Sequence, residues 1–207
     1  MRSRTPVIAF AIFILLASSF ALAQLPSIPH FSADMKTSGS GGHDSTGKMY
    51  WGGSRIRMDM NAQGQDVSII NDMPKKTRYM VMHQQRIYME MNASNPMSQR
   101  MRTPDITPYD PANPCANREG HTCKKVGTET VNGRSCDKWE LTSKQGKQTV
   151  WIDPKLHFPI RSVSADGNTM DLTNIKEGSQ PASLFEFPAG YTKMDLGGMM
   201  GARPPRD

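Results

Sequence analysis

The segment Arg55-Ile-Arg-Met-Asp-Met60 decides the fold class, because apolar and charged residues alternate along it without a break. One side of the alternation carries Ile56, Met58 and Met60, and the other carries Arg55, Arg57 and Asp59. A period of two residues is typical of a β-strand with one buried face and one face in water. The segment therefore predicts a strand over residues 54–60.

Further short segments of this kind follow along the chain, separated by turn residues. The strongest hairpin signal is Asn132-Gly133, which lies between β-type segments over 123–131 and 134–142. An Asn-Gly pair at this position is typical of a two-residue hairpin turn. Counted outward from that turn, the register places Trp139 opposite Val126.

A second hairpin is predicted around Gln84-Gln85. If these two residues form the turn, Met80 lies opposite Met89 and Met82 lies opposite Ile87. Both faces of this hairpin are apolar, one through methionines and the other through Tyr79, Val81 and Tyr88. We therefore expect the hairpin to be covered on both sides.

The whole chain gives about nine or ten short strands at meander spacing and at most two short helices, over 93–101 and 182–187. With so little helix, the apolar face of such a sheet must curl on itself or enclose something. We expect a mainly β protein with a strongly curved antiparallel sheet, that is, a half-open β-barrel with one or two short helices.

The N-terminus predicts export. Arg2 and Arg4 precede an apolar run over 7–16, and Ala21-Leu22-Ala23 follows as a small-x-small cleavage pattern. The run is shorter than the roughly 20 residues of a membrane-spanning helix. We expect a signal peptide over 1–23, a single β-rich domain over 24–196 and a disordered tail over 197–207, in a periplasmic or secreted protein.

Composition argues against several classes of function. The net charge of +6 comes from scattered basic residues, not from the basic stripe that a nucleic-acid-binding protein usually carries. The sequence holds no nucleophile elbow, phosphate-binding glycine loop or paired-histidine zinc motif, and its five histidines are dispersed. We therefore expect no enzymatic activity, no cofactor and no metal site built from these groups.

Cysteine use fits an oxidising compartment. The chain has three cysteines, Cys115, Cys123 and Cys136, which allow three different single bridges. A Cys115–Cys123 disulfide is favoured, because the segment between them is short and rich in turn-forming residues. Cys136 is then left free or buried, since the predicted hairpin places it several residues away from Cys123.

Methionine is the unusual residue, with 16 in the chain. Three Met-x-Met pairs stand out, and each pair places both thioethers on one face of a strand: Met58/Met60, Met80/Met82 and Met89/Met91. One interpretation is core packing, because methionine fills irregular gaps. A second is an adaptable apolar pocket for acyl chains or a greasy peptide. A third is a Cu(I) site, which thioethers would form with the neighbouring His83.

Several segments resemble a family of exported bacterial proteins that carries only a domain-of-unknown-function label. The resemblance covers roughly residues 31–194, and its segments include Phe31-Ser-Ala-Asp-Met35, Gly47-Lys-Met-Tyr50, Val150-Trp-Ile-Asp153 and Leu184-Phe-Glu-Phe-Pro-Ala-Gly-Tyr191. That family is similar, more distantly, to the periplasmic lipoprotein-carrier superfamily. The resemblance implies a half-open antiparallel barrel over an apolar cavity that holds acyl chains.

The sequence thus favours a non-enzymatic periplasmic binding or carrier protein for a lipidic or hydrophobic ligand. We expect its concave face to bind the ligand through Ile56, Met58, Met60, Met80, Met82, Met89, Met91 and Trp139. The expected partners are a hydrophobic ligand or lipoprotein acyl chains, an envelope protein, and a membrane surface in peripheral contact. The alternatives are a periplasmic Cu(I)-binding protein and an envelope interaction module without a small ligand.

Overall fold

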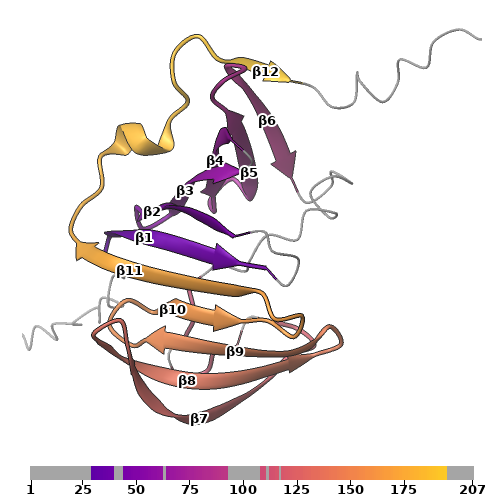
Figure 1. Ribbon diagram of the computed structural model, residues 1–207, viewed down its shortest axis with the longest axis vertical. Coiled ribbons are helices and arrows are strands. Elements are labelled where there is room, and N and C mark those ends of the chain that lie inside the picture. Colours follow the sequence, from indigo (N-terminus) through magenta and orange to yellow (C-terminus); the bar gives the residue numbers. More distant parts are fainter. Residues whose placement is uncertain are drawn as a thin grey trace, which may run out of the picture.

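The computed structural model describes residues 29–39, 44–62, 64–92, 108–110, 112–116 and 118–194. Within these residues the strands form one twelve-stranded sheet, in the order β12-β6-β5-β4-β3-β2-β1-β11-β10-β9-β8-β7. The sheet is open, with β12 and β7 at its edges, and it is strongly curved (Figure 1). The mainly β, curved antiparallel fold predicted from the sequence is confirmed, although twelve strands form where about nine or ten were expected.

The first half of the chain is a meander of six antiparallel strands. Their bounds are β1 Phe31–Ser38, β2 Ser45–Trp51, β3 Arg55–Ala62, β4 Gln65–Asp72, β5 Thr77–Met82 and β6 Ile87–Asn92. The β5–β6 register pairs Met80 with Met89 and Met82 with Ile87, as the Gln84-Gln85 turn predicts.

The second half adds five antiparallel strands on the other side of β1. Their bounds are β7 Thr122–Val131, β8 Arg134–Ser143, β9 Gly146–Asp153, β10 Phe158–Val163 and β11 Thr169–Glu177. β11 pairs with β1 along most of its length, so the first and last long strands join the two halves into one sheet.

The Asn132-Gly133 turn forms as expected, but the register beyond it differs from the prediction. Asn132 and Gly133 both adopt positive φ, 50° and 79°, as the mirror-image hairpin turn requires. A β-bulge at Val126 then shifts the pairing by one residue, so Trp139 lies opposite Lys125 instead of Val126. The predicted Trp139–Val126 pair is therefore wrong, because a bulge inserts an extra residue that strict counting cannot include.

The last described segment returns to the first half of the sheet. After β11, the helical turn expected over 182–187 forms as a short 3₁₀ helix, η1 (Ala182–Phe185). β12 (Thr192–Met194) then pairs in parallel with β6, and nothing in the sequence predicts this strand. The other expected helix, over 93–101, lies outside the described residues, as do the expected signal peptide over 1–23 and the tail over 197–207.

The curvature brings distant strands together on one face. The Trp51 and Phe158 rings lie 6.0 Å apart, although β1 and β11 separate their strands in the sheet. In a flat sheet, strands three positions apart would lie about 14 Å from each other. The face that carries Phe31, Trp51 and Ile56 is therefore the concave one, and the main core fills its centre.

The disulfide is the Cys115–Cys123 bridge, with the two Cα atoms 5.8 Å apart, and Cys136 is free and buried. Within the part of the chain that the structure describes, no helix has the length and apolar character needed to traverse a bilayer.

Candidate ligand-binding face

The strand registers arrange the concave face of β2–β6 into three cross-strand rows. The first row is Trp51, Ile56, Asn71, Arg78 and Met91; the second is Met49, Met58, Ile69, Met80 and Met89; the third is Gly47, Met60, Val67, Met82 and Ile87. We call the second and third rows together the methionine face. Successive rows are about 7 Å apart, because side chains two residues apart share a face.

Seven of the eight predicted ligand-binding residues occupy these rows. They are Ile56, Met58, Met60, Met80, Met82, Met89 and Met91. Alternation within a single strand predicts which residues share a side. The registers of β3–β6 then bring the methionine pairs of β3, β5 and β6 onto the same face. One continuous surface results.

Burial changes along this surface. Ile56 and Met58 are buried in the main core, with Met60 packed against it. Met89 and Met91 are also buried, and Met80 and Met82 are half-buried. The two packed clusters that the described residues form include none of these last four methionines. These four methionines thus lie outside both clusters, with Met89 and Met91 covered and Met80 and Met82 partly exposed.

Trp139, the eighth predicted residue, lies elsewhere. It pairs with Val150, whereas the next residue of β9, Trp151, points to the other face and joins the main core. Trp139 belongs to a second, smaller cluster with Tyr109, Leu141, Val150 and Ile152, against which Cys115 and Cys123 pack. The structure does not bring Trp139 together with the methionines.

The convex face of the first-half strands carries a polar cluster that the sequence analysis did not predict. Ser68, only 1% exposed, donates from Oγ to Asp59 Oδ1 at 2.6 Å and accepts from Arg57 Nη2 at 3.0 Å. His83 Nε2 lies 2.7 Å from the same hydroxyl oxygen, and His83 Nδ1 lies 2.9 Å from the Tyr191 hydroxyl. Sequence alternation predicts the water-facing side for Arg57 and Asp59 but not that their partners converge there.

This cluster fastens the C-terminal segment to the convex face. Arg57 Nη1 donates to the Leu184 carbonyl oxygen at 2.9 Å, and Tyr191 bonds His83. Between these two points, the Phe187 ring stacks on Tyr88 with the centroids 4.4 Å apart. The aromatic side of the β5–β6 hairpin is therefore covered by the chain itself, which leaves the methionine side as the candidate binding surface.

The same polar cluster contains a serine–histidine pair beside a hollow of about 440 Å³. A serine nucleophile needs its proton directed toward the histidine base. Here the single Ser68 proton goes to Asp59, and Arg57 donates to the oxygen, so His83 donates from Nε2. The hydrogen bonds of the pair fit an anchoring role better than a nucleophilic one.

The residues around His83 and Met82 also offer poor geometry for binding a metal ion. The described residues include no group of three or more His, Cys, Asp or Glu side chains that could hold a metal ion. Both ring nitrogens of His83 already have hydrogen-bond partners, and those partners lie on the convex face. His83 is therefore poorly placed to join Met82 around Cu(I).

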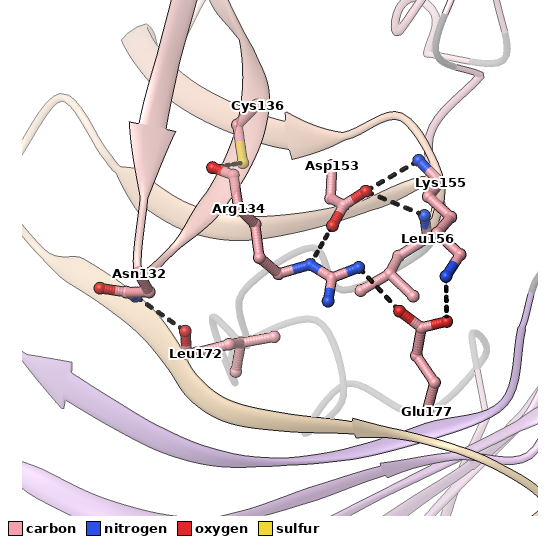
Figure 2. Close-up of polar contacts among 8 residues, drawn as sticks. All are labelled: Asn132, Arg134, Cys136, Asp153, Lys155, Leu156, Leu172 and Glu177. Atoms are coloured by element: carbon pink, nitrogen blue, oxygen red, sulfur yellow. Dashed lines mark hydrogen bonds and ion pairs between the residues drawn. The ribbon is translucent and has the colours of Figure 1, made fainter.

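A partly buried ionic network borders the main core in the second half of the sheet (Figure 2). Arg134 Nε donates to Asp153, and Arg134 Nη2 donates to Glu177 Oε1 at 3.0 Å. Lys155 and Arg134 together hold the pKa of Glu177 below its usual value. Asp153 Oδ1 also accepts from the backbone N–H groups of Lys155 and Leu156, at 2.8 and 3.2 Å. These bonds join the ends of β8, β9 and β11.

Comparison with known families gives one match by sequence. The family model described as "Domain of unknown function (DUF4412)" matches residues 32–157 and 155–191. No curated protein matches the chain.

Solved structures share the fold at low sequence identity. MucB, also solved in a complex of Pseudomonas aeruginosa MucA and MucB, aligns with 79% of this chain at a TM-score of 0.52 and 14% identity. The chain spans 58% of the length of that MucB chain. An uncharacterized conserved protein from Thermus thermophilus aligns with 81% of this chain and 90% of its own, at a TM-score of 0.51 and 11% identity.

The lipoprotein-carrier superfamily is also represented among these structures. A LolA superfamily protein, NE2245 from Nitrosomonas europaea, covers 78% of this chain and 91% of its own, with a TM-score of 0.34 and 10% identity. MucB and the Thermus thermophilus protein, both with TM-scores above 0.5, support the shared fold.

Proposed function

The chain belongs to the DUF4412 family, and we propose that it is an exported, non-enzymatic binding or carrier protein for a hydrophobic ligand held on the methionine face. The observation that carries this proposal is the alignment of Met58/Met60, Met80/Met82 and Met89/Met91 on one concave face, where Met80 and Met82 lie outside both packed clusters and are partly exposed.

Physical properties of this face support binding of apolar chains. Covering apolar surface contributes about 25 cal/mol per Å² before ordering costs are subtracted. Methionine side chains are unbranched and flexible, so they can repack around ligands of different shape. Half-buried Met80, Met82 and Ile87 offer such surface next to buried Met89.

Export is part of the proposal. The predicted signal peptide over 1–23 and the Cys115–Cys123 bridge both fit an oxidising compartment such as the periplasm. An envelope protein is the second class of partner that we consider, since MucB, which shares the fold, is found in complex with MucA.

A binding experiment with a fluorescent apolar probe, 1-N-phenylnaphthylamine, tests the assignment. We expect the probe to bind the wild-type protein and to lose at least about tenfold in affinity in the double variant Met80→Asp, Met82→Asp, because two carboxylates would need burial beside the probe. Both methionines are half-buried, so the variant can be checked for folding by its thermal unfolding.

Two controls define the result. Val126→Asp places one such carboxylate on the edge strand β7, at an exposed position, and should leave binding unchanged. Met80→Leu with Met82→Leu keeps the face apolar and should retain the probe, whereas a Cu(I) site would be lost. Unchanged probe binding in a folded Met80→Asp, Met82→Asp variant would remove the methionine face from the proposal.

A further inference from the structure

The second and third rows of the concave face are built mainly from methionine. Six of their ten positions are methionines, and leucine occupies none of them. Leucine would fill a similar volume with the same apolar character. Methionine differs in its sulfur atom, which an oxidant can convert to a polar sulfoxide. The composition of the methionine face therefore makes its polarity open to chemical change.

Two of these methionines combine partial exposure with a position away from the packed core. Met80 and Met82 on β5 are half-buried and belong to neither packed cluster. Met49 and Met58, which share a row with Met80, are 0% and 3% exposed. Met60 is half-buried but packs against the main core. A dissolved oxidant thus reaches Met80 and Met82 before it reaches the methionines of the core.

A sulfoxide on this face would find no hydrogen-bond donor among the neighbouring side chains. Both rows consist of methionine, isoleucine, valine and glycine, and none of their side chains carries an N–H or O–H group. In the free protein, water can donate to the sulfoxide oxygen of a half-buried side chain. A bound apolar molecule would displace this water and leave the oxygen without a donor, which weakens binding.

From these observations we infer that Met80 and Met82 are oxidation sites whose conversion to methionine sulfoxide releases the hydrophobic ligand. The oxidant is a peroxide, for which hydrogen peroxide is the simplest case. The sulfur lone pair attacks one peroxide oxygen, and the O–O bond breaks as the S–O bond forms. The leaving hydroxide takes the proton of the transferred oxygen and becomes water, so the sulfur is oxidised by two electrons and the peroxide is reduced. This inference rests on the proposed function and adds a chemical control of the same face.

Brief treatment of the folded protein with hydrogen peroxide, followed by peptide mass spectrometry, tests where the oxygen is added. We expect Met80 and Met82 to gain one oxygen atom each at least about tenfold faster than Met49 and Met58, because oxidation of a folded protein follows exposure. Oxidation of all four methionines at the same rate would overturn the inference, since the face would then have no selective site.

Binding of 1-N-phenylnaphthylamine before and after the treatment tests the consequence. We expect oxidised wild-type protein to bind the probe at least about tenfold more weakly, and Met80→Leu with Met82→Leu to keep its affinity within about twofold after the same treatment. Met73→Leu is the matched control, because Met73 is also half-buried but lies in the turn between β4 and β5. This variant should lose binding on oxidation as the wild-type protein does.

A variant provides a second measurement that needs no oxidant. Glutamine is unbranched, polar and uncharged, so Met80→Gln with Met82→Gln places polar oxygens where the sulfoxides would lie. We expect this variant to bind the probe at least about tenfold more weakly than the wild-type protein.

The outcomes separate this inference from the proposed function. If the untreated protein binds the probe and the oxidised, still folded protein binds it equally well, the inference is overturned and the proposed function stands. If oxidation unfolds the protein, unchanged binding in the glutamine variant overturns the inference in the same way. Failure of the untreated protein to bind the probe overturns both.

Discussion

Aspartates at two strand ends are held by the same arrangement in the two halves of the molecule. Asp72 ends β4 and Asp153 ends β9, and each pairs with an arginine that begins the neighbouring strand, Arg55 or Arg134. Oδ1 of each aspartate also accepts a backbone N–H from the following turn. The fourth residue after each aspartate, Lys76 or His157, adopts a φ of 51°. Each aspartate–arginine pair thus ties a turn to the strand beside it.

Removing one partner of such a pair should be costly. We expect Asp153→Ala to lower the free energy of unfolding by about 2–4 kcal/mol, because it leaves Arg134 Nε and two backbone N–H groups without their acceptor. Arg161→Gln breaks a more exposed pair with Asp171 and should cost less than about 1 kcal/mol. Urea unfolding of both variants measures the difference, and equal losses would contradict the structural role of Asp153.

Cys136 provides a pH-dependent test of burial. Desolvation, with a smaller contribution from Asp153, raises the pKa of this thiol from 9.0 to about 11. The folded protein therefore keeps the proton while the unfolded chain loses it, so stability falls as the pH rises from about 9 to about 11.

We expect this alkaline loss of stability to be smaller in Cys136→Ala, with unfolding followed by denaturant titration across that pH range. The folded wild-type protein should also resist a thiol reagent at about pH 8, because the reactive species is the thiolate. Rapid modification of the folded protein would contradict the burial of Cys136.

The C-terminal segment is the element that depends most on side-chain contacts. β12 contributes only three residues to the sheet, and Tyr191 joins it to His83. We expect His83→Ala to increase amide hydrogen exchange in residues 184–194 by about fivefold, corresponding to one lost hydrogen bond of about 1 kcal/mol. Probe binding on the methionine face should not change, because His83 bonds its partners on the convex face. Unaltered exchange would show that the segment is held without this contact.

The strands and turns also show which features of the fold can be predicted from the sequence of this chain. Local alternation and turn chemistry predict the Met80–Met89 pairing and the Asn132-Gly133 turn, because both depend on residues close in sequence. The bulge at Val126 and the strand β12 depend on tertiary context, and neither is visible in the pattern.

The candidate site likewise has features that the sequence predicts and features that it does not. The methionine pairs are predicted by period two, but their alignment into rows requires the registers of β3–β6. The sequence-based prediction also includes Trp139 in the binding face, but the pairing with Val150 and the packing around it show that Trp139 belongs to a separate cluster.

The described residues form one sheet whose two faces have different roles in the first half of the chain. Its convex side is contacted by the chain's own C-terminal segment through Leu184, Phe187 and Tyr191. Its concave side carries the main core and the methionine face. In the second half, the ionic network of Arg134, Asp153 and Glu177 lies at the edge of the same core. The concave side is therefore where we place the ligand.

Native mass spectrometry of the mature protein, purified from its own cell envelope without detergent, is the decisive test of a ligand on the concave side. We predict a co-purifying hydrophobic molecule of roughly several hundred daltons, a size that a single concave site can largely bury. We also predict that Met80→Asp with Met82→Asp removes this added mass. A wild-type protein that carries no added mass and also fails to bind 1-N-phenylnaphthylamine would contradict the proposal.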